Sequence, residues 1–424
     1  MKDSKTIILE ILIILAYYFN NTLGMVFMFG VTVWKLFFQH EKNCIRFLEL
    51  MIMALPMAYI GIAGIAMHQL FSWYNVFLVF FLIVLFHYYS WKVPIHHIAA
   101  SQLVLILLLL LLNLPYSDDM KKTFAEISQI FVMLIPIVMF HTVKKSLQIE
   151  KVKVRRLLYL YADVCVATSI AMILQYMLYH FVHMQVGIIE FYGGGRVSCQ
   201  CLFKGASILP VFIGVGMVIL FMDMLDARIT IANISKMIVI FFAVVLNSSR
   251  TALFMLIVVL AFVCLKQLLR RPGLKPLLIA LVGFVAALGG VHYIISLRKG
   301  LSSFLDANGR IETWMDGIDI WLANIKNFFI GGGFSGGFWI GAMKPHNFPI
   351  QTLAQCGLII SLVIFSMIFV YLWHNRKNRY KYAVWFTLLS GFLVTDFYAN
   401  AFTTVIFILV DLYGALKTDE IVSI

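Results

Sequence analysis

Long apolar runs separated by short polar segments fill the chain. Crossing a lipid bilayer takes about 20 apolar residues, within a range of roughly 17 to 25. Fourteen runs approach this length, and because the first two and last two are short, twelve spans are also possible. We therefore predict an all-α integral membrane protein, a polytopic bundle of about 12–14 transmembrane helices forming one transmembrane domain over residues 1–424. The predicted spans are Ile7–Phe19, Leu23–Phe38, Phe47–Leu70, Trp73–Ser90, Ile98–Leu114, Phe124–Val143, Leu157–Met184, Gly205–Phe221, Ile231–Leu246, Thr251–Leu265, Leu277–Leu297, Ile350–Tyr371, Tyr382–Val394 and Ala401–Leu416.

One long segment, residues 298–347, lies between two apolar runs without being a simple span. Its first part, Asp306–Ile325, has the spacing of an amphipathic helix that Asn308 or Asp306 could cap. Two tryptophans on the apolar face suit a helix in the headgroup region, and packing on other spans explains them equally well. The apolar positions of this predicted helix are Ile311, Trp314, Met315, Ile318, Trp321, Leu322 and Ile325.

The same segment continues into a glycine-rich stretch and then a short polar one. The run GGGFSGG, Gly331–Gly337, must turn sharply or let something approach its backbone. Lys344–Asn347 then leads into the next predicted span. We expect residues 298–347 to form an external loop that contributes to a reaction site.

Composition supports the membrane prediction. The chain of 424 residues is 62% hydrophobic and 12% charged, whereas a soluble domain is roughly half apolar and about a quarter charged. A net charge of +13 would suggest nucleic acid as the partner of a soluble protein, but Lys and Arg gather in the cytoplasmic loops of membrane proteins, so no nucleic-acid partner is expected. The six cysteines include no C-x-x-C pair, and a bridge between the near neighbours Cys199 and Cys201 would be strained.

Basic segments orient the predicted spans. Lys144–Arg156 holds six Lys or Arg, and Lys266–Lys275 and Arg376–Lys381 hold four each, so all three should be cytoplasmic. Alternation from these anchors places both termini in the cytoplasm. It also predicts a tight helical hairpin that turns at Asn247–Arg250, with Arg250 at its outer end.

Three predicted external arginines run against this charge bias. Arg196 follows three glycines, Arg250 stands between two apolar runs, and Arg310 opens the amphipathic helix. Each could simply reach toward headgroup phosphates. Three arginines in three separate segments, together with His346, also suit a joint site for an anionic, lipid-linked headgroup, since the guanidinium fork matches phosphate oxygens.

Histidine titrates near neutral pH, so His346 could act as a base beside such a headgroup, although a single His at the start of a span is more often structural. In glycosyl transfer from a polyprenyl diphosphate, the acceptor hydroxyl loses a proton and the leaving diphosphate gains charge, which arginines stabilise. Among the acids, Asp163 and Asp411 should be paired or interfacial near cytoplasmic ends, and Asp396 could assist the site.

Motifs for other chemistries are missing from the sequence. There is no phosphate-binding GxxxxGK[ST] loop, no D-x-D pair for a nucleotide sugar and no H-E-x-x-H zinc motif. We therefore expect no metal and no cofactor at this site, and the donor need not be a cytoplasmic nucleotide sugar.

Three stretches resemble the bacterial family of O-antigen ligases and of O-antigen and capsular polysaccharide polymerases. NSSRTALFMLIVV (247–259) is similar to the family's S-x-S-R start of a span. GRIETWMDGIDIWLANIKNFFIGGGFSGG (309–337) resembles its Arg, Trp and glycine-turn pattern, and HNFPIQTLAQCGLIISLV (346–363) its His-Asn before a span with a glycine, here Gly357. A fourth stretch, GGGRVSCQCLFKGASILP (193–210), resembles the family's external arginine loop.

The resemblance implies a metal-independent, inverting glycosyltransferase of the bacterial cytoplasmic membrane that acts on undecaprenyl-diphosphate-linked glycans as donor and acceptor. Arg250, Arg310 and Arg196 correspond to arginines that contact the diphosphate, and His346 to the residue that activates the acceptor, so His346 and Arg250 are the catalytic candidates. A chain-length regulator and a flippase are candidate protein partners. Two departures from the family pattern are Gln355 in place of a frequent Glu and Cys199–Lys204 in place of a small-residue and Pro-Asn run.

Within this family, a polymerase that joins repeat units into O-antigen, capsule or exopolysaccharide is favoured over a ligase that transfers the glycan to lipid A core. Two alternatives lie outside it. A transporter or flippase of lipid-linked sugars should have polar residues near mid-span and broken helices. A structural subunit would carry the external arginines and His346 incidentally.

Overall fold

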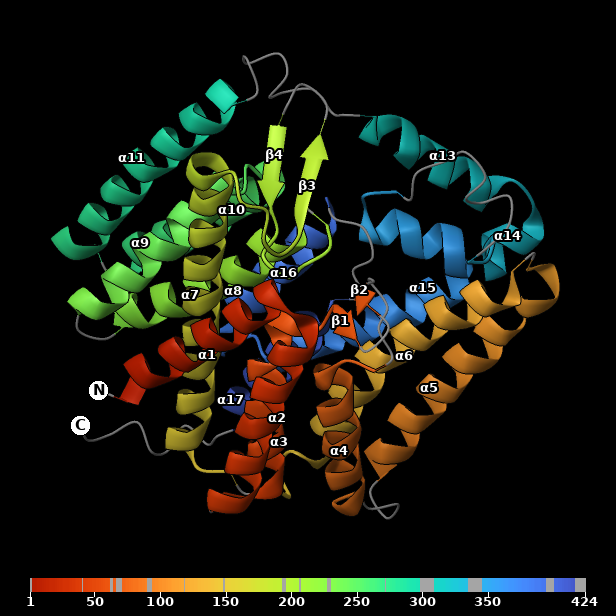
Figure 1. Cartoon of the computed structure of the whole chain (residues 1–424). Coiled ribbons are helices and arrows are strands. Elements are labelled where there is room, and N and C mark those ends of the chain that lie inside the picture. The colour runs from red at the N-terminus through yellow and green to blue at the C-terminus, as the bar shows by residue number, and fades with distance from the viewer. Residues whose placement is uncertain are drawn as a thin grey trace. The chain divides into compact units, whose positions relative to one another are not determined.

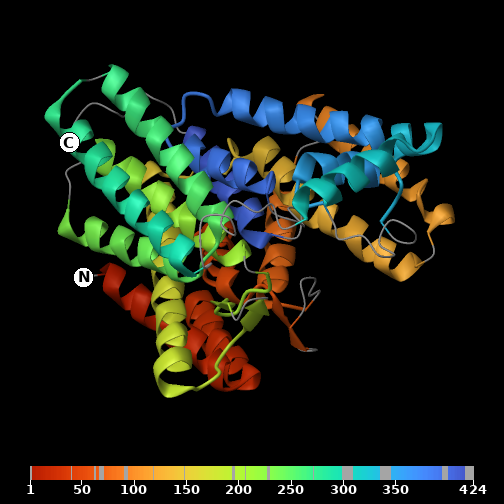
Figure 2. The same cartoon turned by 90° about the horizontal axis from the view of Figure 1, so that it is seen from above.

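The structure is a computed structural model that describes the chain except residues 1, 40, 62–63, 66–70, 90–93, 118, 148, 193–195, 206, 227–229, 271, 298–308, 335–344, 394–399 and 416–424. The described part forms 16 α-helices and two short antiparallel hairpins (Figures 1 and 2). The chain divides into two compact units. The first unit is formed by Met1–Phe81, Val152–Asp306 and Tyr382–Ser390, and the second by Leu82–Lys151, Ala307–Lys381 and Gly391–Ile424.

The first unit is built around α8 (Ile208–Asp226), which is apolar on all sides and whose span Ile208–Leu225 is wholly buried. Two glycines let neighbouring helices approach α8: Gly216 faces the side chain of Cys165, and Gly214 faces the ring of Phe386. Its other elements are α1 (Lys2–Phe19), α2 (Asn21–Phe38), α3 (Asn43–Met53), β1 (Ile60–Gly61), β2 (Gly64–Ile65), the first part of α4 (Trp73–His87), α7 (Lys151–Val182), β3 (Ile189–Tyr192), β4 (Arg196–Cys199), α9 (Ile231–Leu246), α10 (Arg250–Arg270), α11 (Leu274–Leu297) and α16 (Lys381–Gly391).

The second unit has its most buried segment in α17 (Ala401–Gly414), where every residue from Phe402 to Leu412 is buried. The hydroxyl of Tyr371 donates a hydrogen bond to the carbonyl of Phe407 at 2.6 Å, which joins α17 to α15. The remaining elements of this unit are α5 (Pro94–Leu111), α6 (Met120–Val143), α13 (Arg310–Leu322), α14 (Ile325–Ile330) and α15 (Phe348–His374).

Seven helices in the described part are long and apolar enough to cross a membrane, and four shorter apolar helices accompany them. This agrees with the predicted class of helical membrane protein, whereas the number of crossings and their orientation stay predictions. The seven helical stretches are Asn21–Phe38, Thr123–Val143, Lys151–Val182, Ile208–Leu225, Arg250–Arg270, Pro276–Leu297 and Phe348–His374.

The predicted span Phe47–Leu70 is wrong. Helix α3 ends at Met53, and a short 3-10 turn containing Pro56 follows it. Proline lacks the amide hydrogen that a continuing helix would need at this point. The chain then forms the hairpin of β1 and β2, in which Gly61 pairs with Gly64. Because this segment is mostly apolar, its hydropathy showed neither the helix end nor the hairpin of β1 and β2. The all-α prediction also omitted the hairpin of β3 and β4.

Charged side chains at the ends of α2, α3 and α7 pair with one another in what we call the glutamate cluster: Lys35, Glu41, Glu49, Lys153 and Arg156. The Nζ of Lys35 lies 2.5 Å from Oε2 of Glu49, and both side chains are buried. Arg156 lies 3.3 Å from Glu49 and 3.6 Å from Glu41, which also pairs with Lys153 at 2.8 Å. Pairing offsets the large cost of removing these charges from water.

The predicted pairing of two buried aspartates is confirmed. Asp163 lies 2.6 Å from the Nζ of Lys236 in the first unit. In the second unit, Asp411 lies 2.5 Å from Lys144 and 3.0 Å from Nδ1 of His141. Asp396, which we expected to assist the site, lies outside the described residues.

Candidate functional site

The serine turn, residues Asn247–Arg250, joins α9 to α10 in the first unit. Helix α9 ends at Leu246 and α10 begins at Arg250, so the predicted turn between two helices is present, whereas its place at the outer face stays a prediction. Ser248 has a left-handed backbone with φ of 61°. Because a side chain other than glycine costs roughly 1–2 kcal/mol in this conformation, the surrounding contacts must hold the turn.

Strand β4 supplies those contacts. The hydroxyl of Ser198 donates to the carbonyl of Asn247 at 2.9 Å, and Nδ2 of Asn247 donates to the carbonyl of Cys199 at 2.9 Å. Nε2 of Gln200 donates to the hydroxyl of Ser198 at 2.6 Å and so fixes its orientation. Buried side chains thus tie the hairpin of β3 and β4 to the serine turn.

This docking brings two predicted site residues into one region of the first unit. Arg196 is the first residue of β4, two positions before Ser198, and the rise of a strand places their Cα atoms about 7 Å apart. Arg250 follows Asn247 by three positions and opens α10. The side chain of Arg196 lies outside the described part, so only its backbone position is defined.

Four polar atoms around the serine turn are buried without a hydrogen-bond partner in the described part of the chain. They are the hydroxyl oxygens of Ser248 and Ser249, Oδ1 of Asn247 and Oε1 of Gln200. Leaving such an atom unpaired costs about 1–3 kcal/mol, and protein or water partners normally prevent this. Because the turn also precedes the free amides of α10, its hydroxyls and amides could receive the oxygens of an anion.

In the second unit, α13 begins at Arg310, later than the predicted helix Asp306–Ile325. Gly309, with φ of 69°, is the residue before the helix. The predicted capping residues Asn308 and Asp306 lie outside the described residues. The helix ends at Leu322, and Asn324 starts the separate helix α14 by accepting a hydrogen bond from the amide of Asn327 at 2.8 Å.

The buried positions of α13 lie outside its apolar stripe, for which the sequence left headgroup placement and helix packing open. Thr313 and Gly317 are the buried residues, whereas the side chains of Ile311 and Met315 are 59% and 52% exposed. Small residues form the packed face because α13 lies close against the start of α15 (Figures 1 and 2).

This close approach places α13 beside His346. A Cβ added to Gly317 would lie 2.8 Å from Ile350 and 2.9 Å from Pro345. His346 is the next residue and is partly buried, and Asn347 caps α15 by accepting a hydrogen bond from the amide of Ile350 at 3.0 Å. Arg310 stands seven positions before Gly317, about 10 Å along the helix axis.

The glycine turn, Gly331–Gly333, meets a break in α15 at Gly357, where φ is 71° and ψ is −179°. The amides of Gly332 and Gly333 donate to the carbonyls of Ala354 and Gln355 at 2.7 and 3.2 Å. A Cβ on Gly331 would lie 2.2 Å from the carbonyl oxygen of Gln355. The prediction of a sharp turn or a close backbone approach is confirmed here, while residues 335–344, including Lys344, lie outside the described part.

The four predicted site residues therefore form two pairs, one pair in each unit. Arg196 and Arg250 belong to the first unit, on segments joined by the hydrogen bonds of Asn247. Arg310 and His346 belong to the second unit, on helices that pack at Gly317. The roles of the four residues stay predictions.

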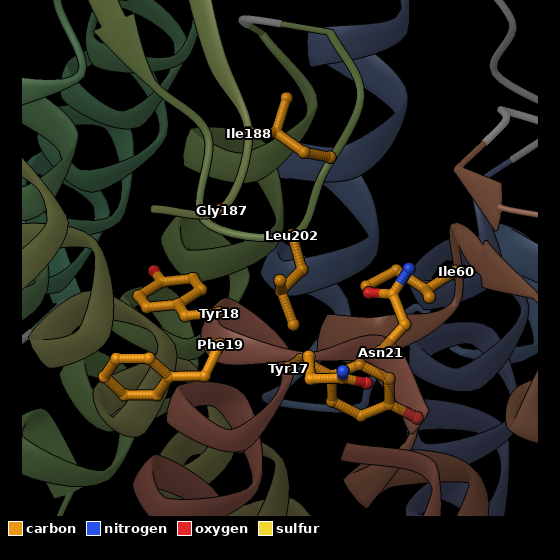
Figure 3. A pocket seen from close by; sticks show the side chains of 9 residues that line it. Tyr17, Tyr18, Phe19, Asn21, Ile60, Gly187, Ile188 and Leu202 are labelled. Atoms are coloured by element: carbon orange, nitrogen blue, oxygen red, sulfur yellow. The ribbon is translucent and has the colours of Figure 1, made fainter. Parts of the chain in front are cut away.

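A pocket of about 280 Å³ opens in the first unit at the junction of α1 and α2, and we call it the α1–α2 pocket (Figure 3). Its lining includes the side chains of two residues from each of three segments: Tyr17 and Tyr18, Asn20 and Asn21, and Ile188 and Leu202. No sequence feature pointed to this pocket, because its walls come from segments far apart in the chain.

The six cysteines are free and buried, so no bridge joins Cys199 to Cys201. Burial raises the pKa of each of these two thiols to about 12, which keeps them protonated and unreactive at neutral pH. In the described part of the chain, no three His, Cys, Asp or Glu side chains are grouped so that they could hold a metal ion.

Neither a known protein family nor a curated protein matches this sequence. The resemblance to O-antigen ligases and polymerases therefore rests on the motifs alone.

Proposed function

We propose that the protein is a membrane glycosyltransferase that polymerises undecaprenyl-diphosphate-linked oligosaccharide repeat units into O-antigen, capsular polysaccharide or exopolysaccharide. The observation that carries this proposal is the serine turn. Its buried hydroxyls lack partners in the described part of the chain, Arg250 follows directly, and the strand that starts at Arg196 is bonded to it. Hydroxyl groups, helix amides and guanidinium groups are the donors that diphosphate oxygens require.

The proposed reaction divides the work between the two pairs. Arg250 and Arg196 bind the diphosphate of the donor, and Arg310 contributes further positive charge. His346 takes the proton from the acceptor hydroxyl as its oxygen attacks the anomeric carbon. The bond from that carbon to the diphosphate oxygen breaks on the opposite face, so the configuration inverts, and the arginines stabilise the charge on the leaving diphosphate. On this proposal no metal or cofactor takes part.

The proposal places the serine turn and residues 298–347 at the outer face of the bacterial cytoplasmic membrane, with both termini in the cytoplasm. The basic segments support this orientation because Lys and Arg concentrate in cytoplasmic loops. The exposed apolar residues of α13, Ile311 and Met315, suit a helix lying in the headgroup region. A lipid-linked glycan would meet the site at this level.

One observation favours a second candidate function, transport of a lipid-linked sugar. Helix α15 is broken at Gly357, and interrupted helices at which carbonyls and amides are freed are common in transporters. In this protein the amides of Gly332 and Gly333 already occupy the two carbonyls at the break. The break therefore has a structural explanation, and we place transport second.

The test uses purified protein in nanodiscs, a lipid-diphosphate-linked repeat unit, EDTA and no nucleotide sugar. A ladder of lengthened glycans, resolved by gel and mass spectrometry, is the expected product of a polymerase. Transfer that occurs only after lipid A core is added would identify a ligase. Transfer to neither acceptor by folded protein, with movement of the lipid-linked unit between leaflets, would support the transporter.

Two substitutions test which residues carry out the glycosyl transfer. Arg250→Ala should lower the rate about 10²–10³-fold, the range for losing one group that stabilises developing charge. His346→Ala should lower it about 10²–10⁴-fold, the range for losing a general base. Arg270→Ala is the matched control for the arginine, because Arg270 ends the same helix and is exposed. A full-length ladder from Arg250→Ala or His346→Ala would contradict the assigned mechanism.

A further inference from the structure

We propose that the α1–α2 pocket is a subsite for one neutral sugar residue of the lipid-linked glycan. This inference rests on the proposed function and gives its substrate a second point of contact. It assigns to the first unit the recognition of a sugar, in addition to the diphosphate at the serine turn.

The chemistry of the pocket suits an uncharged ring with hydroxyl groups. None of its lining residues is charged, so the pocket offers nothing to balance a phosphate. The rings of Tyr17 and Tyr18 and the side chain of Leu202 lie at the pocket and are themselves largely buried (Figure 3). The volume of about 280 Å³ is near the lower end of the range for small-molecule sites, roughly 300–1,000 Å³, so it suits one ring and not a chain of several.

Two amide side chains at the pocket are available to sugar hydroxyls. Oδ1 of Asn20 caps α2 by accepting hydrogen bonds from the amides of Thr22 and Leu23 at 2.7 and 3.4 Å. Within the described residues, no hydrogen bond uses Nδ2 of Asn20 or the side chain of Asn21. Both asparagines are exposed, so their free amide groups can reach a ligand at the pocket. Small-molecule sites use a few such polar groups to fix orientation.

The wall residues Ile188 and Leu202 belong to a segment whose backbone is held in place before any ligand binds. The fully buried side chain of Gln175 donates from Nε2 to the carbonyls of Val186 and Ile188 at 2.6 and 2.9 Å. Its Oε1 accepts from the amide of Cys201 at 2.8 Å, and Cys201 itself has a left-handed backbone with φ of 56°. A strained backbone fixed by a buried side chain is typical of a preorganised binding wall.

The same segment connects the pocket to the serine turn. Leu202 lines the pocket, and the carbonyl of Cys199 accepts the hydrogen bond from Asn247 in the turn. Leu202 follows Cys199 by three positions, so their Cα atoms are at most about 10 Å apart. A sugar in the pocket would therefore lie close to a diphosphate at the turn.

The experiment measures sugar binding separately from transfer. Saturation-transfer NMR would use protein in nanodiscs and, as probes, the repeat-unit oligosaccharide released from its diphosphate and a panel of neutral methyl glycosides. Ile188→Trp fills the pocket and Asn21→Ala removes an amide. Val182→Trp is the matched control, because Val182 ends α7, is exposed and does not line the pocket.

We expect the oligosaccharide and at least one glycoside to bind the wild-type protein, Val182→Trp and Arg250→Ala. Binding should weaken at least tenfold in Ile188→Trp and Asn21→Ala, with a rise in KM for the lipid-linked donor that exceeds the fall in kcat. Melting temperatures equal to that of the wild type would show that both variants are folded.

Three outcomes would overturn the subsite. One is equal oligosaccharide binding by Ile188→Trp and the wild type. Another is binding of a lysolipid chain in the pocket and of no sugar, which would identify the pocket as a site for an acyl chain. The third is a normal KM for Ile188→Trp in a protein that forms the ladder, which removes the subsite and leaves the proposed function intact. Pocket-dependent sugar binding without any ladder would instead support the subsite and remove the polymerase.

Discussion

The first unit contains two polar regions that differ in whether their buried polar atoms have partners. In the glutamate cluster, each carboxylate has at least one cationic partner, as in the contact of 2.5 Å between Lys35 and Glu49. In the serine turn, the hydroxyls of Ser248 and Ser249 have no partner in the described part of the chain, although the same turn makes strong bonds to β4. Lys35 and Glu49 are about as shielded from water as the serine turn, whereas Arg156 in the same cluster is half-exposed.

The difference separates a structural role from a binding role. Paired charges contribute to the fold because removing one partner leaves an uncompensated charge. Unpaired buried hydroxyls reduce stability, and they serve a purpose only if a ligand supplies the missing hydrogen-bond partner. The comparison therefore indicates that substitutions in the glutamate cluster should change stability, whereas substitutions in the serine turn should change donor binding.

The largest effect is expected from Glu49→Ala. This change leaves the buried ammonium group of Lys35 without its carboxylate, while Arg156 keeps Glu41, and breaking such a buried pair costs about 3–5 kcal/mol. Thermal unfolding in detergent would measure it, with Asp319→Ala on the exposed side of α13 as the control. Equal melting temperatures for the two variants would show that the cluster adds no stability.

A smaller effect, of a different kind, is expected from Ser249→Ala. Its hydroxyl has no partner in the described part of the chain, so its loss should change the free energy of unfolding by less than about 1 kcal/mol. Affinity for the lipid-diphosphate donor should fall about tenfold, the equivalent of one hydrogen bond to a charged group. Ser296→Ala, at an exposed position near the end of α11, is the matched control. A large loss of stability with unchanged donor affinity would reverse the assignment.

The smallest effect concerns the two thiols behind the serine turn. Burial raises the pKa of Cys199 and of Cys201 to about 12, whereas a thiol in the unfolded chain has a pKa near 9. Because the unfolded chain loses these protons first, stability should fall as pH rises from 9 toward 12. Mass spectrometry should detect no maleimide on either thiol in folded protein at pH 8 and full labelling after denaturation. Rapid labelling of folded protein would show that this region opens.

Most of the fold could be predicted because an apolar run long enough to cross a bilayer is also long enough to form a helix. The failure at Phe47–Leu70 arose because hydropathy does not register Pro56 or the paired glycines of β1 and β2. The hairpin of β3 and β4 did have a signal. Two short β-prone runs flank the three glycines 193–195, and this pattern favours a hairpin.

The candidate site was predictable in its parts and not in its connections. The charge pattern located the turn before Arg250, but no sequence feature showed that Ser198 and Asn247 would join it to β4. On α13 the helical period was right, but it did not show which face packs, because the close approach at Gly317 decides packing there more than the apolar stripe does. Contacts between distant segments depend on how side chains fit together in three dimensions. The spacing of apolar residues along one sequence does not reveal that fit.

The break in α15 has a consequence for how the protein is made. The carbonyls of Ala354 and Gln355 depend on the amides of Gly332 and Gly333, which a ribosome adds to the chain earlier than α15. When α15 leaves the translocon, lipid can offer these carbonyls no hydrogen bond, at a cost of several kcal/mol each. Insertion of this helix should therefore finish only when the preceding glycine turn has docked, which makes the turn an assembly partner of α15 during biosynthesis.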